Sequence, residues 1–199
     1  MIMPKEKREI QKQDIMPLDV YIKNRKELRK SIVSFKKDRR IALGPYATFY
    51  FENYETMLAQ VQEMLYIEKG GDAQLKDELE AYNPLIPNGK ELTATLMFEI
   101  DDPISRSAFL NKVGGIEEKV FIKIDGEIAK AVPEKDVDRT SADGKASSVQ
   151  FIHFELTDKQ IQKFKQKNIN VELGIDHKDY SHTTKLSFEN INSLSADFN

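Results

Sequence analysis

The chain has 199 residues, of which 40% are apolar and 32% charged, the composition of a globular protein with one substantial core. It contains no cysteine, which excludes disulfides, thiolate metal ligands, iron–sulfur ligation and a cysteine nucleophile. The N-terminal stretch lacks the apolar segment of a secretory signal, and no later run is long enough to span a membrane. We therefore expect a soluble cytoplasmic protein without a membrane partner.

The net charge of −3 is unevenly distributed along the chain. Residues 1–40 contain 13 Lys/Arg against 6 Asp/Glu, which leaves 17 against 27 for the remainder. Residues 1–14 have little apolar surface to bury, so we expect a basic, flexible arm there and a single domain over 15–199. The basic segment from Arg25 to Arg40 could bind an acidic protein or RNA.

The N-terminal half of the domain shows helical patterns around one short strand. A helix is predicted from Pro17 to about Arg40, because apolar residues recur at helical spacing along it. A strand over 47–51 leads to a second helix with Asn53 as its N-cap, and a short helix follows over 74–81. The apolar stripe of the second helix comprises Met57, Leu58, Val61, Met64 and Leu65.

A weak internal repeat occupies the C-terminal half. Strand 92–100, helix 105–113 and strand 120–125 form one strand–helix–strand unit, and residues 154–176 repeat the order with a helix over 159–166. This pattern predicts an α+β fold, in which a mainly antiparallel sheet is shared by both units and the N-terminal helices pack on it.

Two of the three histidines, His177 and His182, fall in one predicted hairpin. Apolar residues alternate from Val171 to Ile175, which places His177 on the apolar side, and Leu186 and Phe188 set the parity that places His182 there too. With 178–181 as a four-residue loop, the histidines are cross-strand neighbours with Cβ atoms roughly 5 Å apart. They could hold a metal or transfer a proton.

A metal site needs a third ligand, because zinc, iron and manganese usually take three or more protein ligands. Our best candidate is Glu52, at a strand–helix junction, completing an iron, manganese or zinc site with His177 and His182. Asp176 and Tyr180 adjoin the histidines as candidate ligand-binding residues. The alternative is structural, each imidazole capping the core edge and bonding a carbonyl group or Tyr180.

Three further residues are weaker candidates for a site. His153 and Glu155 share one face of their own strand and could contribute if that strand lay beside the hairpin. Glu63 lies about 160° from the centre of the apolar stripe of its helix, so helical geometry points it away from the core. Phosphate-loop, dinucleotide-binding, nucleophilic-elbow and His-Glu-x-x-His motifs are all absent from the sequence.

Seven short strings carry a resemblance to a known family. They are Ile15-Met16-Pro17-Leu18, Leu43-Gly44-Pro45, Phe51-Glu52-Asn53, Gln62-Glu63-Met64-Leu65, Ala81-Tyr82-Asn83-Pro84-Leu85-Ile86-Pro87, Ala94-Thr95-Leu96-Met97 and Gly174-Ile175-Asp176-His177. Together they resemble an uncharacterised bacterial family, domain of unknown function 3501, from about residue 15 to the histidine hairpin, and the family names no activity. The resemblance implies that the gene lies near those of rubrerythrin-like and iron–sulfur proteins, hence a role in peroxide- or iron-linked redox stress. It also implies that another element covers Glu63.

Two functions are therefore open. The first is an accessory protein that binds a metal or small polar ligand near His177 and His182 in redox or iron homeostasis. The second is a non-enzymatic interaction module whose basic N-terminal helix binds an acidic protein or, less in keeping with the sequence, RNA. Metal-assisted hydrolysis is a third interpretation, and it would need an open coordination position on the metal.

Overall fold

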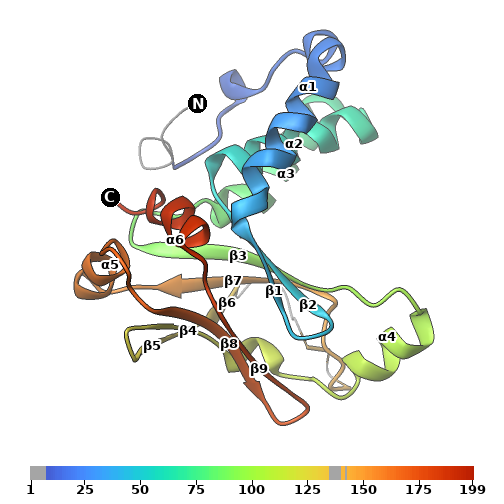
Figure 1. The fold of residues 1–199 in the computed structure, drawn as a ribbon. Coiled ribbons are helices and arrows are strands. Elements are labelled where there is room, and N and C mark those ends of the chain that lie inside the picture. The colour runs from blue at the N-terminus through green and yellow to red at the C-terminus, as the bar shows by residue number, and fades with distance from the viewer. Residues whose placement is uncertain (1–7, 135–139, 142) are drawn as a thin grey trace.

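The computed structural model describes residues 8–134, 140–141 and 143–199, which form two antiparallel sheets packed face to face (Figure 1). The first sheet has the strand order β1-β2-β3-β7-β6 and the second has the order β5-β4-β8-β9. The strands are β1 Arg40–Leu43, β2 Ala47–Glu52, β3 Glu91–Phe98, β4 Val120–Ile124, β5 Glu127–Lys130, β6 Val132–Pro133, β7 Val149–Glu155, β8 Val171–His177 and β9 Tyr180–Lys185.

The core lies between the sheets because the strands alternate apolar and polar residues. On β3, Leu92, Ala94 and Leu96 are fully buried toward the second sheet, where Ile122 and Leu173 pair across β4 and β8. Burying apolar faces from both sheets in one core is the main stabilising contribution in such a fold. The predicted α+β class is confirmed.

The two strand–helix–strand units are present, but each one crosses between the sheets. The first unit runs from β3 through α4 (Pro103–Leu110) to β4, and the second runs from β7 through α5 (Asp158–Phe164) to β8. β3 pairs with β7 in one sheet, and β4 pairs with β8 in the other. The expected shared sheet is therefore wrong, because the second strand of each unit closes the core from the opposite side.

Three helices form a layer on the outer face of the first sheet (Figure 1). They are α1 Leu18–Lys36, α2 Tyr54–Glu68 and α3 Gly71–Tyr82. Asn53 is the N-cap of α2, as predicted, and its side chain accepts a hydrogen bond from the Thr56 amide at 3.1 Å. A second apolar cluster holds this layer to the sheet through Phe151. None of the described helices combines the length and apolar character that a membrane crossing requires.

Three local features differ from the sequence predictions. The first helix ends at Lys36, and after η3 (Lys37–Arg39) the chain enters β1, whose alternation of Ile41 and Leu43 has the period of a strand. Helix α6 (Phe188–Ser195) was not predicted, although Ser187 and Asn190 form a capping box at its start. The remaining short helices are η2 Lys12–Asp14, η4 Asn83–Leu85 and η5 Ile116–Lys119.

The predicted arm over 1–14 is packed against the body of the protein from residue 8, and residues 1–7 lie outside the described chain. Ile10 is buried, and its backbone bonds the Asn83 side chain in both directions. The Arg8 guanidinium donates to the carbonyl groups of Pro87 and Asp197 at 2.9 and 3.1 Å. The ordered domain therefore begins before residue 15.

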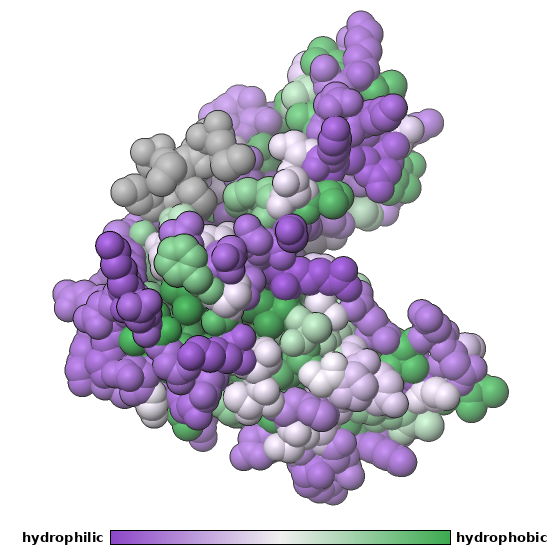
Figure 2. All heavy atoms as spheres, in the orientation of Figure 1, coloured by the Kyte–Doolittle hydropathy of each residue, from purple (hydrophilic) through white to green (hydrophobic). Residues whose placement is uncertain are grey.

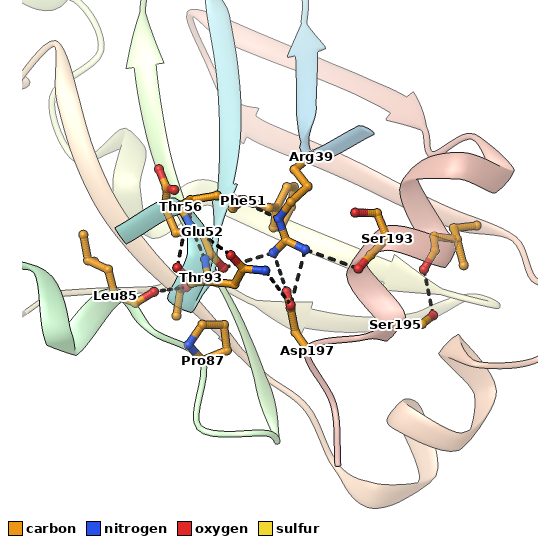
Figure 3. A network of polar contacts seen from close by, with 12 residues as sticks. Arg39, Phe51, Glu52, Thr56, Leu85, Pro87, Thr93, Ser193, Ser195 and Asp197 are labelled. Atoms are coloured by element: carbon orange, nitrogen blue, oxygen red, sulfur yellow. Dashed lines mark hydrogen bonds and ion pairs between the residues drawn. The ribbon is translucent and has the colours of Figure 1, made fainter. Parts of the chain in front are cut away.

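A buried ion pair between Arg39 and Asp197 joins the helical layer, the first sheet and the C-terminus (Figure 3). Both side chains are 1% exposed, and the guanidinium also donates to the carbonyl oxygens of Phe51, Glu52 and Ser193. An unpaired charge in this position would be very unfavourable, so the geometry of the whole network is constrained.

Replacing Asp197 by Ala should leave the Arg39 charge buried without its partner. We expect Asp197→Ala to lower the free energy of unfolding by about 3–5 kcal/mol, measured by urea denaturation. The matched control is Asp72→Ala, which removes the partner of Lys12 from a solvent-exposed ion pair and should cost below about 1 kcal/mol. Equal losses in the two variants would contradict a special role for the buried pair.

Candidate functional site

The β8–β9 hairpin turns over two residues, Lys178 and Asp179, where the sequence predicted a loop of four. His177 therefore pairs with Tyr180, and His182 pairs with Ile175. A shift of two residues preserves the faces of both strands, so the histidines share one face as predicted. They are diagonal neighbours, however, and not a directly opposed pair.

Each histidine has a local structural partner. The buried His177 ring accepts a hydrogen bond at Nδ1 from the Asp179 amide at 3.2 Å. The His182 ring packs edge-on against Tyr180, with 4.5 Å between ring centroids, and covers Gly44 so closely that a Cβ there would lie 2.6 Å from the imidazole. Both contacts are structural, as the alternative for the pair expected, but His177 bonds a backbone amide in place of a carbonyl group, and His182 packs on the Tyr180 ring.

Tyr180 fixes the turn between β1 and β2. Its hydroxyl donates to the Leu43 carbonyl and accepts from the amides of Tyr46 and Ala47 at 3.2 and 3.0 Å. Burial raises the pKa of the Tyr180 phenol, which therefore remains neutral. Because all its hydrogen-bonding capacity is used within the fold, this hydroxyl has no free position for a ligand.

The predicted carboxylates do not complete a metal site with the histidines. Ala47 lies beside Tyr180, whereas Glu52 ends the same strand about 17 Å farther along. Asp176 points to the exposed face opposite the histidines, near Ser181. Among residues 8–134, 140–141 and 143–199, no group of three or more His, Asp or Glu side chains could hold a metal. The structure therefore does not bring His177, His182 and Glu52 together.

Glu52 belongs to the polar outer face of the first sheet. It is 4% exposed, and its Oε1 atom accepts a hydrogen bond from the Thr95 hydroxyl at 2.9 Å. Its Oε2 atom is buried without a hydrogen-bond partner in the described part of the chain. Neither histidine of the hairpin shares this environment.

His153 forms an ion pair with Glu91 on the outer face of the first sheet. Its Nδ1 atom lies 3.0 Å from Glu91 Oε2, and the other Glu91 oxygen accepts from the Asn88 amide. The hydrogen bond to Glu91 raises the pKa of His153 against the opposing effect of burial. His153 and the hairpin histidines thus lie in different sheets.

Glu63 is covered by α1, as the family resemblance implied. The Tyr21 hydroxyl donates to Glu63 Oε2 at 2.6 Å, and the Arg25 guanidinium binds both carboxylate oxygens and lies over the Tyr66 ring. The Arg25 hydrogen bond lowers the pKa of Glu63, while burial and Glu63 raise that of Tyr21 to about 12. We call Tyr21, Arg25 and Glu63 the Glu63 latch.

Beyond the latch, α1 and α2 separate around a cavity of about 410 Å³. We call it the α1–α2 groove, lined by Leu28, Ile32, Phe35, Leu58 and Ala59 and edged by Arg29 and Lys36.

The rest of α1 is unusually exposed. Tyr21 is its single buried residue, and Val33 is 67% exposed. The apolar residues of α1 whose spacing predicted this helix therefore line a groove, and only Tyr21 among the residues of α1 is buried. In the sequence, the feature that indicated an exposed helix was the excess of basic over acidic residues in α1, which contains six Lys/Arg and two Asp/Glu.

These features define a class of α+β protein with two facing antiparallel sheets, a layer of helices outside one sheet, and a groove between two of those helices. The sequence model of the family described as Protein of unknown function (DUF3501) matches residues 9–198, and the chain belongs to this family.

The chain is also similar to a solved structure, described as a novel protein of unknown function from Burkholderia pseudomallei K96243 at 1.90 Å resolution. The identity is 32% with a TM-score of 0.89, over 96% of this chain and 99% of the other. No curated protein matches the chain.

The His153–Glu91 pair should make stability depend on pH. Because the pKa of His153 is raised by folding, the stabilisation is fully present below the unfolded value of about 6.5 and is lost as the pH rises through the folded value. We expect His153→Gln to cost most stability near pH 5.5 and less near pH 8.5, measured by urea denaturation. Glu91→Gln should flatten the same profile, and a cost independent of pH would contradict the assignment.

The Glu63 latch should hold α1 on α2. Glu63→Gln should lower the free energy of unfolding by about 1–2 kcal/mol and speed hydrogen exchange in α1. Since folding lowers the pKa of Glu63, this difference should vanish as the pH falls through the folded value. The control is Glu27→Gln, an exposed carboxylate on another side of α1, and comparable effects from both variants would count against the latch.

Proposed function

We propose that this protein is a non-enzymatic interaction module, which binds an acidic amphipathic helix of a partner protein in the α1–α2 groove. The observation that carries the proposal is the cavity of about 410 Å³ beneath a basic helix that is otherwise exposed. A cavity of this size accepts one or two large apolar side chains, which is how helices commonly anchor in grooves.

The charges at the groove favour an acidic partner. Neither Arg29 nor Lys36 forms a hydrogen bond or short ion pair within the described part of the chain. Three carboxylates also line the groove, but each already interacts within the fold: Glu63 is bound by Arg25, Asp14 accepts a hydrogen bond from the Gln11 amide, and Glu55 has an interaction of its own. Figure 2 shows hydrophilic residues gathered over the upper lobe that α1 and its neighbours form, above a hollow facing the sheets. Carboxylates on a partner helix could pair with the two free cations while its apolar face enters the groove.

The apolar lining favours protein over RNA. Single-stranded RNA binds through phosphate contacts and stacking on exposed aromatic rings, and neither interaction needs an aliphatic cavity. Leu28, Ile32 and Leu58 offer contacts that suit an apolar side chain. Rubrerythrin-like and iron–sulfur proteins, implied by the family resemblance, are the first natural partners to test, and a role in redox or iron stress belongs to this proposal.

A charge-matched pair of variants tests the groove. The probe is a fluorescent synthetic peptide of about 18 residues, or five helical turns, with leucines at helical spacing and glutamates elsewhere. Arg29→Glu/Lys36→Glu should weaken its binding at least about tenfold in fluorescence anisotropy. Lys23→Glu/Lys30→Glu changes the net charge equally on the opposite side of α1, where neither residue lines the groove, and should have less than about a threefold effect.

Three results would overturn this function. They are equal losses in the two double variants, equal binding of a scrambled peptide with the same composition, and tighter binding of single-stranded RNA than of the peptide. Circular dichroism of each variant would confirm that the helices remain folded.

A further inference from the structure

A second cavity of about 480 Å³ lies between α6 and the connection from α5 to β8. We call it the α5–α6 cavity. Its lining includes Lys165, Lys167, Lys185, Phe188, Ile191 and Asn192. It is separate from the α1–α2 groove, with which it shares no lining residue.

Among the described residues, three lysines and no acidic residue line this cavity, so its charged lining is positive. Lys165 is tethered, since its ammonium donates to the Asn199 carbonyl. Lys167 and Lys185 make no hydrogen bond or ion pair with any described residue. Glu172 lies directly across from Lys185 on β8 and interacts with it electrostatically, but its ion pair is with Lys123. Two ammonium groups that have no hydrogen bond or ion pair in the described part of the chain therefore line one concave surface.

Phe188 provides an aromatic surface at the same cavity. It opens α6 and is 70% exposed, an unusual state for a phenylalanine side chain. Ile191, one helical turn later, is half-buried against the core. In Figure 2 an apolar patch over α6 is bordered by hydrophilic residues.

We propose that the α5–α6 cavity binds a phosphate monoester carried on a planar aromatic ring. The ring would stack on Phe188 and contact Ile191, and the phosphate would accept hydrogen bonds from Lys167 and Lys185. A phosphate monoester carries a charge near −2 at neutral pH, which matches two free ammonium groups. A cavity of this volume lies in the range of small-ligand sites.

A long nucleic acid fits these observations less well. Its affinity would come from a basic path following several phosphates, whereas the cations here converge on a single concave site. Asn192 and the side-chain amides of Gln166 and Asn168 also line the cavity and could bond substituents on the ring.

The experiment measures binding of 2-naphthyl phosphate by isothermal titration calorimetry, with 2-naphthol and inorganic phosphate as partial ligands. We expect saturable one-to-one binding of the full probe and at least about tenfold weaker binding of each part. Lys167→Gln/Lys185→Gln should weaken the full probe at least about tenfold. Phe188→Ala should weaken the full probe and leave inorganic phosphate unchanged.

The charge-matched control is Lys112→Gln/Lys130→Gln, two exposed lysines that do not line the cavity. This control should bind the probe like the wild type. The proposal would be overturned by the absence of saturable binding, by equal losses in the two double variants, or by tighter binding of an oligonucleotide than of the probe. None of these variants alters the α1–α2 groove, so the two proposals fail or succeed independently.

Discussion

The buried ion pair of Arg39 and Asp197 constrains the rest of the structure because it fixes the point where the end of α1 joins the first sheet. Arg39 follows the end of α1, and its guanidinium bonds the last carbonyls of β2, the C-terminal end of α6 and the Asp197 carboxylate. Moving any of these segments would leave a charge or several polar groups buried without partners. The direction of α1, and so the opening of the α1–α2 groove, depends on this network. The Glu63 latch secures the other end of the same helix.

The crossing of each strand–helix–strand unit from one sheet to the other explains why the protein has two separate cavities. Both sheets direct their apolar faces inward, and the α1–α3 layer packs on the outer face of the first sheet through a second apolar cluster that includes Phe151. The short helices α5 and α6 remain outside the sheets, where the chain turns back, and the α5–α6 cavity forms between them. Basic residues line both openings, although the whole chain carries a net charge of −3.

In the histidine hairpin, strand periodicity predicted which face each side chain occupies but not what packs against it. Strand periodicity correctly placed His177 and His182 on one face, since the side-chain period of a strand is independent of what packs on it. The turn length, the use of the Tyr180 hydroxyl by the β1–β2 turn, and the separation of Glu52 from the hairpin all depend on contacts with other segments. The structure therefore keeps Glu52 away from the two histidines that were predicted to share a metal with it.

The sequence by itself determined the α+β class, the N-cap at Asn53, the two strand–helix–strand units and the family, because periodicity, capping and local strings are properties of short segments. It could not determine that the units join two sheets, that Arg39 finds a partner 158 residues away, or that α1 leaves a groove beside α2. These features are decided by how elements pack and which buried charges can be paired. The apolar stripe of α1 was visible in the sequence, but only the tertiary structure decided that most of it stays outside the core and lines the α1–α2 groove.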